Sequence, residues 1–310
     1  MFKYLILKPY LDYKIWGGNH LANWFNSEKK NIGEALIISA LENKESVIIN
    51  LGQEVLLSEF YRANKKFFGN YYGDLYPLLG KIIDANDDLS IQVHPDDEYA
   101  EKNFYKLGKT ECWYVLEAPE NAQIIYGSKV EDIAIFKEHV LQNNWDQILN
   151  YETVKKGDLI NVPYGTIHAI TKGITVFEIQ QNSDLTFRLY DYDRLDINNE
   201  KRELHLEHSF NVLNLKNKIE IINKKEGILF ESEFFNIEKL IVDEEIFIKK
   251  ENAYWTQITV IKGYLNIDYY TLTKGYSLIL KHKIGLKLKG QAEILLTYIN
   301  KNTLKKINQL

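Results

Sequence analysis

Four polar residues from three stretches of the chain have the types and the spacing of a metal-binding set. Gln92 and His94 stand two positions apart in the alternating segment 89–94, so a strand there places both side chains on one face. Glu111 begins a later apolar stretch, and His168 ends the pattern Gly-x5-Pro-x-Gly-x2-His. Two imidazoles, a carboxylate and an amide oxygen suit Zn²⁺, and Mn²⁺, Fe²⁺ or Co²⁺ also accept such ligands. We therefore expect these four residues to bind one metal ion.

Two members of this set are weak candidates when each is taken alone. An amide is a poor metal ligand, so Gln92 could instead orient a water molecule. An isolated histidine such as His94 is more often a partly buried polar side chain than a ligand. The metal hypothesis therefore depends on the combination of all four residues.

Three other residues could also do chemistry. His205 and His208 are three positions apart in a predicted helix, which is compatible with a second metal site, but a solvated helix face is the more common meaning of such a pair. Cys112 should point to the strand face opposite Glu111, so we expect a packed core thiol rather than a nucleophile. A single cysteine excludes an intrachain disulfide and fits a reducing compartment.

The elements that must position these residues are mostly strands. Short alternating segments bounded by turns recur along the chain, and 13% of the residues are aromatic, which favours a mainly β antiparallel sandwich or barrel. Helical patterns are fewer and short. We expect helices within 54–68, with Ser58 as the cap, and within 95–107, 131–149 and 203–213.

The length of 310 residues indicates about two domains. The segment 214–225 is polar and rich in lysine, as is typical of a linker. The segments 156–163 and 274–281 resemble each other, since each has a glycine turn followed by a strand, but only the first continues into a histidine. We expect a metal-binding domain with small helical insertions over 1–215 and a smaller β domain without a metal site over 216–310.

Composition excludes several classes of protein. Hydrophobic residues make up 45% of the chain and charged residues 26%, which is ordinary for a globular protein and unlike a disordered one. The net charge of −5 argues against a nucleic-acid partner. The apolar stretches are too short for a membrane helix, and Lys8 and Pro9 interrupt the N-terminal one too early for a signal peptide. We expect a cytoplasmic protein that acts on a small molecule.

Several motifs resemble a known family. The glycine-proline-histidine pattern resembles the second motif of cupins, which are jelly-roll barrels with inward-facing metal ligands. The full set of motifs, in one order along the chain, resembles the type I mannose-6-phosphate isomerases in their short bacterial form, most strongly over 8–210. The motifs are Lys-Ile-Trp-Gly-Gly (14–18), Leu-Ser-Ile-Gln-Val-His-Pro-Asp (89–96), Gly-Lys-Thr-Glu (108–111), Pro-Tyr-Gly-Thr-Ile-His-Ala (163–169) and Asp-Leu-Thr-Phe-Arg-Leu-Tyr-Asp-Tyr (184–192).

This resemblance implies two cupin-type jelly rolls and a zinc-dependent aldose–ketose isomerase with one zinc ion per chain. The implied reaction interconverts mannose 6-phosphate and fructose 6-phosphate through a cis-enediol(ate). The implied zinc ligands are the same four residues. Arg188 matches the active-site arginine of the family, Lys109 its active-site lysine, and Glu178 a carboxylate proposed to act in proton transfer.

The implied chemistry leaves some roles open. Arg188 could stabilise the enediolate or hold the phosphate, and Lys109 should project into the same cavity as Glu111 by strand parity. Glu178 could instead be a structural partner of Arg188, and Ser90 is a candidate phosphate contact. The base could be Lys109, Glu178 or a water on the metal.

The sequence also departs from the family. Some longer members carry a histidine immediately before the active-site lysine, where this chain has Gly108, and the large helical insertion of the long forms is missing. Two other functions compete with the isomerase. One is a non-catalytic bicupin that binds a sugar phosphate. The other is a metal-dependent cupin oxygenase. Gln92 argues against the oxygenase, because it stands where such enzymes usually have their first histidine ligand.

Overall fold

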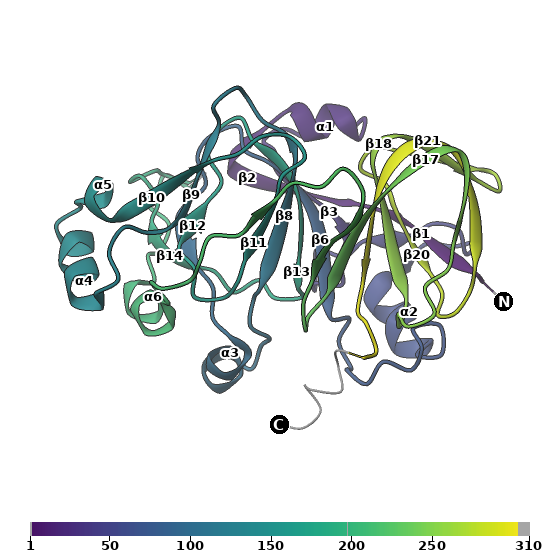
Figure 1. Cartoon of the computed structure of the whole chain (residues 1–310), viewed down its shortest axis with the longest axis horizontal. Helices are drawn as coiled ribbons and strands as arrows, with labels where there is room; N and C mark the ends of the chain where they lie inside the picture. The colour runs from purple at the N-terminus through teal and green to yellow at the C-terminus, as the bar shows by residue number, and fades with distance from the viewer. Residues whose placement is uncertain (1, 197, 303–310) are drawn as a thin grey trace. The chain divides into compact units, whose positions relative to one another are not determined.

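A computed structural model describes residues 2–196 and 198–302 of the chain. It is built mostly from strands with a few short helices, which confirms the mainly β prediction (Figure 1). The chain divides into two compact units. Unit 1 contains the described residues of segments 1–11, 35–81 and 223–310, and unit 2 contains 12–34 and 82–222.

This division differs from the single boundary expected near residue 215. In unit 1, β1 (Tyr4–Lys8) pairs with β20 (Ser277–Leu280) and with β4 (Val47–Ile48), so the N-terminal segment joins the C-terminal strands. In unit 2, β15 (Ile221–Ile222) pairs with β11 (Leu159–Val162), although it lies in the expected linker. Pairing between segments far apart in the sequence produces this interleaving, and local hydrophobic patterns do not encode it.

Two sheets hold the strands of unit 2. The five-stranded sheet has the order β10 (Leu149–Thr153), β9 (Gln123–Ser128), β12 (His168–Ala169), β7 (Ile91–Val93) and β14 (Phe187–Tyr190). The seven-stranded sheet begins with β15 and β11 and continues with β8 (Glu111–Glu117), β13 (Thr175–Gln181), β6 (Leu78–Asp84), β3 (Ile32–Ile38) and β2 (Tyr10–Gly18). The last three of these strands include residues of both units.

Side chains from both sheets form one core in unit 2. Ile124 and Tyr126 of the five-stranded sheet are buried in the same cluster as Trp113, Val115 and Ile160 of the seven-stranded sheet. Side chains along each strand point alternately to the two faces of its sheet, so every second residue faces this core. The sheets are open rather than closed into a complete barrel, and the double-sheet arrangement is the expected jelly roll.

Short helices cover the outer face of the five-stranded sheet, as Figure 1 shows for α4 (Ile133–Leu141), α5 (Trp145–Ile148) and α6 (Leu206–Val212). Phe136 and Val140 of α4 pack with Ile91 and Phe187 of the sheet. Two more helices of this unit are α1 (His20–Trp24) and α3 (Asp97–Phe104). The carboxylate of Asp96 caps α3 by accepting a hydrogen bond of 2.8 Å from the backbone N–H of Tyr99.

Unit 1 has a nine-stranded sheet with an aliphatic core. Its path runs through β16 (Gly227–Glu231), β17 (Asn236–Ile248), β21 (Leu286–Tyr298), β18 (Thr256–Ile267), β20, β1, β4 and β5 (Val55–Leu56), and β19 (Tyr270–Thr273) pairs with β18. Its helix α2 (Leu57–Ala63) begins after Leu56, so the expected Ser58 cap is wrong. The repeated glycine turns do match, because φ is +93° at Gly157 and +92° at Gly275.

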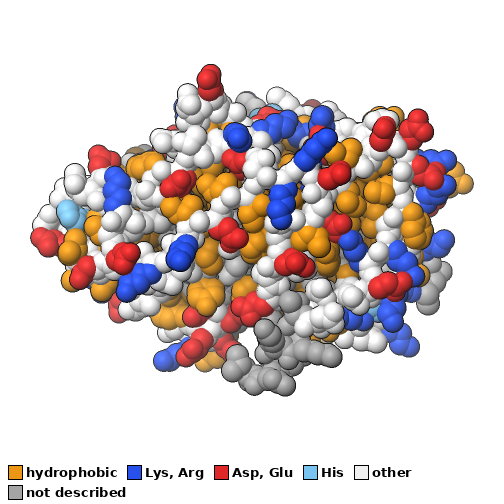
Figure 2. All heavy atoms as spheres, viewed as in Figure 1, with side chains coloured by type: hydrophobic (Ala, Val, Ile, Leu, Met, Phe, Trp, Pro, Cys, Tyr) orange, Lys and Arg blue, Asp and Glu red, His pale blue; other side chains and the backbone are white. Residues whose placement is uncertain are grey.

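The surface carries both signs of charge. Figure 2 shows acidic and basic side chains side by side, with hydrophobic ones between them. Among the described residues, none of the helices has the length and apolar character needed to cross a membrane.

Candidate metal and active site

Three buried residues of unit 2 converge on one point. One ligand-capable atom from each of His94, Glu111 and His168 lies within 4.8 Å of the other two. The Nε2 atoms of His94 and His168 each lie 3.4 Å from a different oxygen of the Glu111 carboxylate. All three side chains are at most 1% exposed. Two imidazoles and a carboxylate at this spacing can hold a divalent cation, so the residues fit the expected metal.

Strand pairing explains how the sequence brings these residues together. His168 of β12 pairs directly with Gln92 of β7, and His94 follows β7, while Glu111 begins β8 in the facing sheet. The turn before β12 is tied to the same point, since the Gly165 N–H donates to the His94 carbonyl at 2.9 Å. Gly165 has φ +78°, a conformation that favours glycine. The Pro-x-Gly-x2-His pattern therefore delivers His168 beside His94.

A backbone carbonyl orients the His168 ring. Its Nδ1 lies 2.9 Å from the carbonyl oxygen of Thr166, so this nitrogen carries the proton and donates it. Nε2 is then left with the lone pair that faces Glu111. The Gln92 amide nitrogen lies 3.3 Å from this Nε2, so ligation by Gln92 would require its amide to turn and present Oε1.

Trp113 was not identified from the sequence, and it links two carboxylates. Its indole N–H lies 3.0 Å from Glu111 Oε1 and 2.9 Å from Glu178 Oε2. Its ring also meets the His168 imidazole edge-on, with 5.3 Å between centroids. Trp113 is two positions after Glu111 on the same strand, so strand parity was the available signal.

Lys109 lies beside the convergent carboxylate, as strand parity predicted. Its Nζ is 3.0 Å from Glu111 Oε2, and the side chain is 5% exposed. The backbone before it is tightly packed, because a Cβ at Gly108 would lie 2.4 Å from the carbonyl carbon of Asp96. The glycine that departs from the longer relatives is therefore required here, and a histidine would not fit.

Arg188 lies on the strand that neighbours Gln92. It pairs with Gln92 across β14 and β7, so both side chains lie on one face. The turn that follows is held by Asp191, which forms ion pairs with Arg194 at 2.7 Å and with Arg202. Among the described residues, no carboxylate lies within ion-pair distance of the Arg188 guanidinium. Partial burial lowers the pKa of the Arg188 guanidinium below its usual value, and the group stays cationic.

The other predicted site residues are placed as follows. Glu178 of β13 is 2% exposed and shares the Trp113 N–H, and its register partner across the sheet is Trp113. Ser90 is 5% exposed and directly precedes β7. Both therefore stay candidates for the same interior.

Three residues have structural environments instead. The His208 ring stacks on Phe187, with 5.1 Å between centroids, and His205 Nδ1 accepts from the Arg188 backbone N–H at 3.2 Å. Burial lowers the pKa of His205, with the Arg188 charge as the next cause. Cys112 is a free buried thiol whose pKa is raised by burial.

Known proteins share this chain's motifs and fold. The family model "Phosphomannose isomerase type I, catalytic domain" matches residues 4–125. The mannose-6-phosphate isomerase of Streptococcus mutans serotype c is 38% identical over 96% of this chain and 98% of its own length. Mannose-6-phosphate isomerase ManA of Bacillus subtilis is 37% identical over 95% of this chain and 98% of its own length.

A solved structure agrees with these relatives. The crystal structure of the mannose 6-phosphate isomerase from Bacillus subtilis superimposes with a TM-score of 0.88 at 34% identity, covering 96% of this chain and 100% of that chain. The match covers nearly all of both chains at this identity, so the two proteins share their whole architecture and not a single module. This chain therefore belongs to the type I phosphomannose isomerase family of enzymes.

Proposed function

We propose that this enzyme interconverts D-mannose 6-phosphate and D-fructose 6-phosphate through a cis-enediol(ate), with unit 2 as its catalytic unit. The observation that carries the proposal is Lys109 beside the buried His94, Glu111 and His168 group, with a second cation, Arg188, on the strand that pairs with Gln92. A sugar phosphate needs cations for its phosphate and for the oxyanion that develops during proton transfer. A non-catalytic binding protein would need only the first of these.

Zinc is the metal that we propose for this centre, one ion per chain, held by His94, Glu111 and His168 with Gln92 as the fourth ligand. The donor set of two imidazoles and a carboxylate favours Zn²⁺ over the hard cations, which prefer oxygen ligands alone. When bound, zinc supplies a Lewis acid that polarises the carbonyl of the sugar without redox chemistry.

The chain's own residues divide the remaining work. Arg188 holds the phosphate or the enediolate oxygen as a permanent cation. The Ser90 hydroxyl donates a hydrogen bond to the phosphate. Lys109 neutralises charge on the same side of the cavity. Either Lys109 or Glu178 moves the proton between C1 and C2, and Trp113 keeps Glu178 and Glu111 in fixed relative positions.

Burial supports this assignment of roles. Lys109, Glu111 and Glu178 are each at most 4% exposed, so the site excludes water from the reacting carbons. Charges buried together in this way act on a substrate more strongly than they would in water. The cytoplasmic location expected from the sequence fits a phosphorylated substrate, and it stays a prediction.

Turnover of mannose 6-phosphate tests the proposal. We expect the purified protein to form fructose 6-phosphate, to lose this activity on chelation, and to regain it when zinc is restored. Metal content is measured on the same samples by mass spectrometry. A fully zinc-loaded protein without activity would contradict the enzymatic function, and equal activity before and after complete removal of metal would contradict the role of zinc.

A further inference from the structure

A second cavity lies on the other face of the five-stranded sheet. It has a volume of about 350 Å³ and is lined by residues of β7, β9, β10, β14, α5 and the adjoining loops. Ile91 lines it, whereas Gln92, the next residue, faces the metal group. The cavity and the candidate active site therefore share strand β7 but open on opposite faces of the sheet.

Three aromatic residues, Trp145, Tyr190 and Tyr192, form one wall of the cavity, and a bulge in β14 turns Tyr190 toward it. The register shifts between Arg188 and Tyr190, so that Arg188 pairs with Gln92 but Tyr190 pairs with Ile91. Tyr190 therefore lies on the outer face with Ile91, where it stacks on Trp145 with 5.0 Å between centroids and 21° between planes.

The wall continues into Tyr192 and is held rigidly. The Tyr190 and Tyr192 rings are 5.0 Å apart, and the Arg194 guanidinium lies 5.0 Å from the Tyr192 centroid. Arg194 is fixed in turn by its ion pair with Asp191. A preformed wall of this kind loses little conformational entropy when it binds a ligand.

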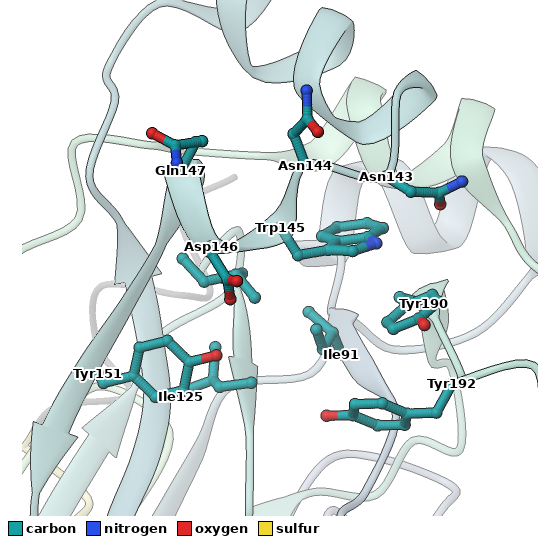
Figure 3. A pocket seen from close by; sticks show the side chains of 11 residues that line it. Ile91, Ile125, Asn143, Asn144, Trp145, Asp146, Gln147, Tyr151, Tyr190 and Tyr192 are labelled. Atoms are coloured by element: carbon teal, nitrogen blue, oxygen red, sulfur yellow. The ribbon is translucent and has the colours of Figure 1, made fainter.

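Polar groups complete the rim. Figure 3 shows Tyr190 and Tyr192 on one side of the cavity and Tyr151 and Asp146 on the opposite side, with the carboxylate of Asp146 directed toward the space between. Amide side chains from Asn143, Asn144 and Gln147 lie at the upper edge. Burial raises the pKa of both Tyr151 and Tyr192, so their hydroxyls stay protonated and can donate hydrogen bonds.

The charge of this lining is opposite to that of the active site. Asp146 is the one acidic residue among the eleven that line the cavity, and no lysine or arginine is among them. A phosphate would therefore meet a carboxylate in the lining, and the nearby Arg194 and Lys129 already contact Tyr192 and the Asp146 carbonyl, which disfavours binding of an anion. An uncharged ligand with hydroxyl groups avoids this repulsion.

We propose that this cavity is a second binding site, which takes an uncharged pyranose such as a free hexose or the terminal unit of an oligosaccharide. The C–H face of a pyranose packs on aromatic ring faces, because those faces carry partial negative charge. Its hydroxyls match the carboxylate, amides and phenols of the rim, and few polar groups around apolar walls are the usual pattern of a small-ligand site. The volume is at the small end of the usual range of roughly 300–1,000 Å³, which fits one or two sugar rings.

Titration calorimetry with methyl α-D-mannopyranoside tests the site in the full-length, zinc-loaded protein. We expect weak saturable binding that survives in the presence of saturating mannose 6-phosphate and in the Arg188→Ala variant. Trp145→Ala should weaken it at least about tenfold, because this residue supplies the largest ring of the wall. Tyr105→Ala is the matched control, since Tyr105 is 92% exposed and does not line the cavity.

Each result decides the proposal. Absence of saturable binding, competition by mannose 6-phosphate, or equal binding by Trp145→Ala and the wild type would overturn it. If Trp145→Ala does not fold, Asp146→Lys decides instead, because its side chain is exposed and its change removes the carboxylate that accepts hydrogen bonds from the sugar hydroxyls. Weaker binding by that variant supports the site, and unchanged binding overturns it. Binding is measured apart from turnover, so failure here is distinguishable from failure of the isomerase proposal.

Discussion

The two units use the same strand geometry for different purposes. In each, a glycine at φ near +92° starts a strand that runs into the interior, β11 in unit 2 and β20 in unit 1. After β11 the chain reaches His168, whose Nε2 faces Glu111. After β20 it reaches His282, whose Nδ1 lies 2.9 Å from the Ala253 carbonyl. The histidine that follows the strand is therefore a candidate metal ligand in unit 2, and in unit 1 it forms a hydrogen bond with a backbone carbonyl.

The interiors of the units differ in the same way. Unit 1 fills its interior with aliphatic side chains, such as Leu278, Leu288 and Ile294, which are fully buried. Unit 2 buries Lys109 and Glu111 beside two histidines, whereas buried charges of unit 1 are paired, Glu238 with Lys250 and Lys239 with Glu293. Burying apolar area stabilises a fold, whereas burying charge costs free energy unless partners compensate it. We therefore expect the buried charges around Glu111 to cost stability that the apolar interiors of both units offset.

The largest expected effect comes from removing a metal ligand of unit 2. His168→Ala should lower turnover by at least about a thousandfold, because the Lewis acid is lost together with the imidazole. Zinc content measured by mass spectrometry should fall with it. His282→Ala in unit 1 is the matched control and should keep both zinc and turnover. Stoichiometric zinc in His168→Ala would contradict the ligand assignment.

Arg188→Ala should come next, with turnover lowered by roughly 10²- to 10³-fold through loss of a positioned cation. Zinc content should stay unchanged, because Arg188 is not among the convergent ligands. Steady-state kinetics and metal analysis on one preparation check both statements. A variant that turns over substrate at the wild-type rate would reject the role.

Truncations at equivalent positions of the two repeated strands separate stability from activity. Leu278→Ala in β20 and Ile160→Ala in β11 each remove a fully buried side chain, and each should lower the free energy of unfolding by about 2–5 kcal/mol. Only Ile160→Ala should also lower turnover per folded molecule, because Ile160 pairs with Trp113. Chemical denaturation and turnover measure the two quantities. Equal loss of turnover in both variants would break the comparison.

Two buried indoles offer a finer test. Trp113→Phe removes the N–H shared by Glu111 and Glu178, while Trp255→Phe in unit 1 removes one that donates to the Tyr76 hydroxyl at 2.8 Å. Each should cost about 1–3 kcal/mol of stability, because a buried acceptor is left without its donor. We expect only Trp113→Phe to lower kcat, by about tenfold. If both variants keep wild-type kcat, Trp113 does not position the carboxylates.

The smallest expected effect is on the pH dependence of stability, and a histidine of each unit should contribute to it. Burial lowers the pKa of His205 in unit 2 and of His282 in unit 1 below 6.5, so the unfolded chain takes up these protons first as the pH falls. Stability should therefore decrease as the pH drops below about 6.5. Denaturation of the wild type and of His205→Gln and His282→Gln across this range checks the sign. A wild type whose stability rises on acidification would contradict it.

Local spacing in the sequence predicted much of the interior of unit 2. Parity along one strand predicted that Gln92 and His94 share a face, and both lie against His168; it also predicted that Lys109 faces the same way as Glu111, which it contacts. The unit boundary escaped prediction, because the pairing of β1 with β20 joins residues that are more than 260 positions apart. The shared Trp113 N–H and the bulge in β14 also escaped, because both depend on pairing between strands and not on periodicity within one.

Strand β7 is only three residues long, and its alternating side chains serve both faces of its sheet. Gln92 belongs to the metal side, and Ile91 belongs to the floor of the outer cavity. A slip of one residue in its register would exchange the two faces, turning an aliphatic side chain toward the metal and an amide toward the helices. We therefore expect a single insertion or deletion in β7 to disturb the metal side and the outer cavity at once.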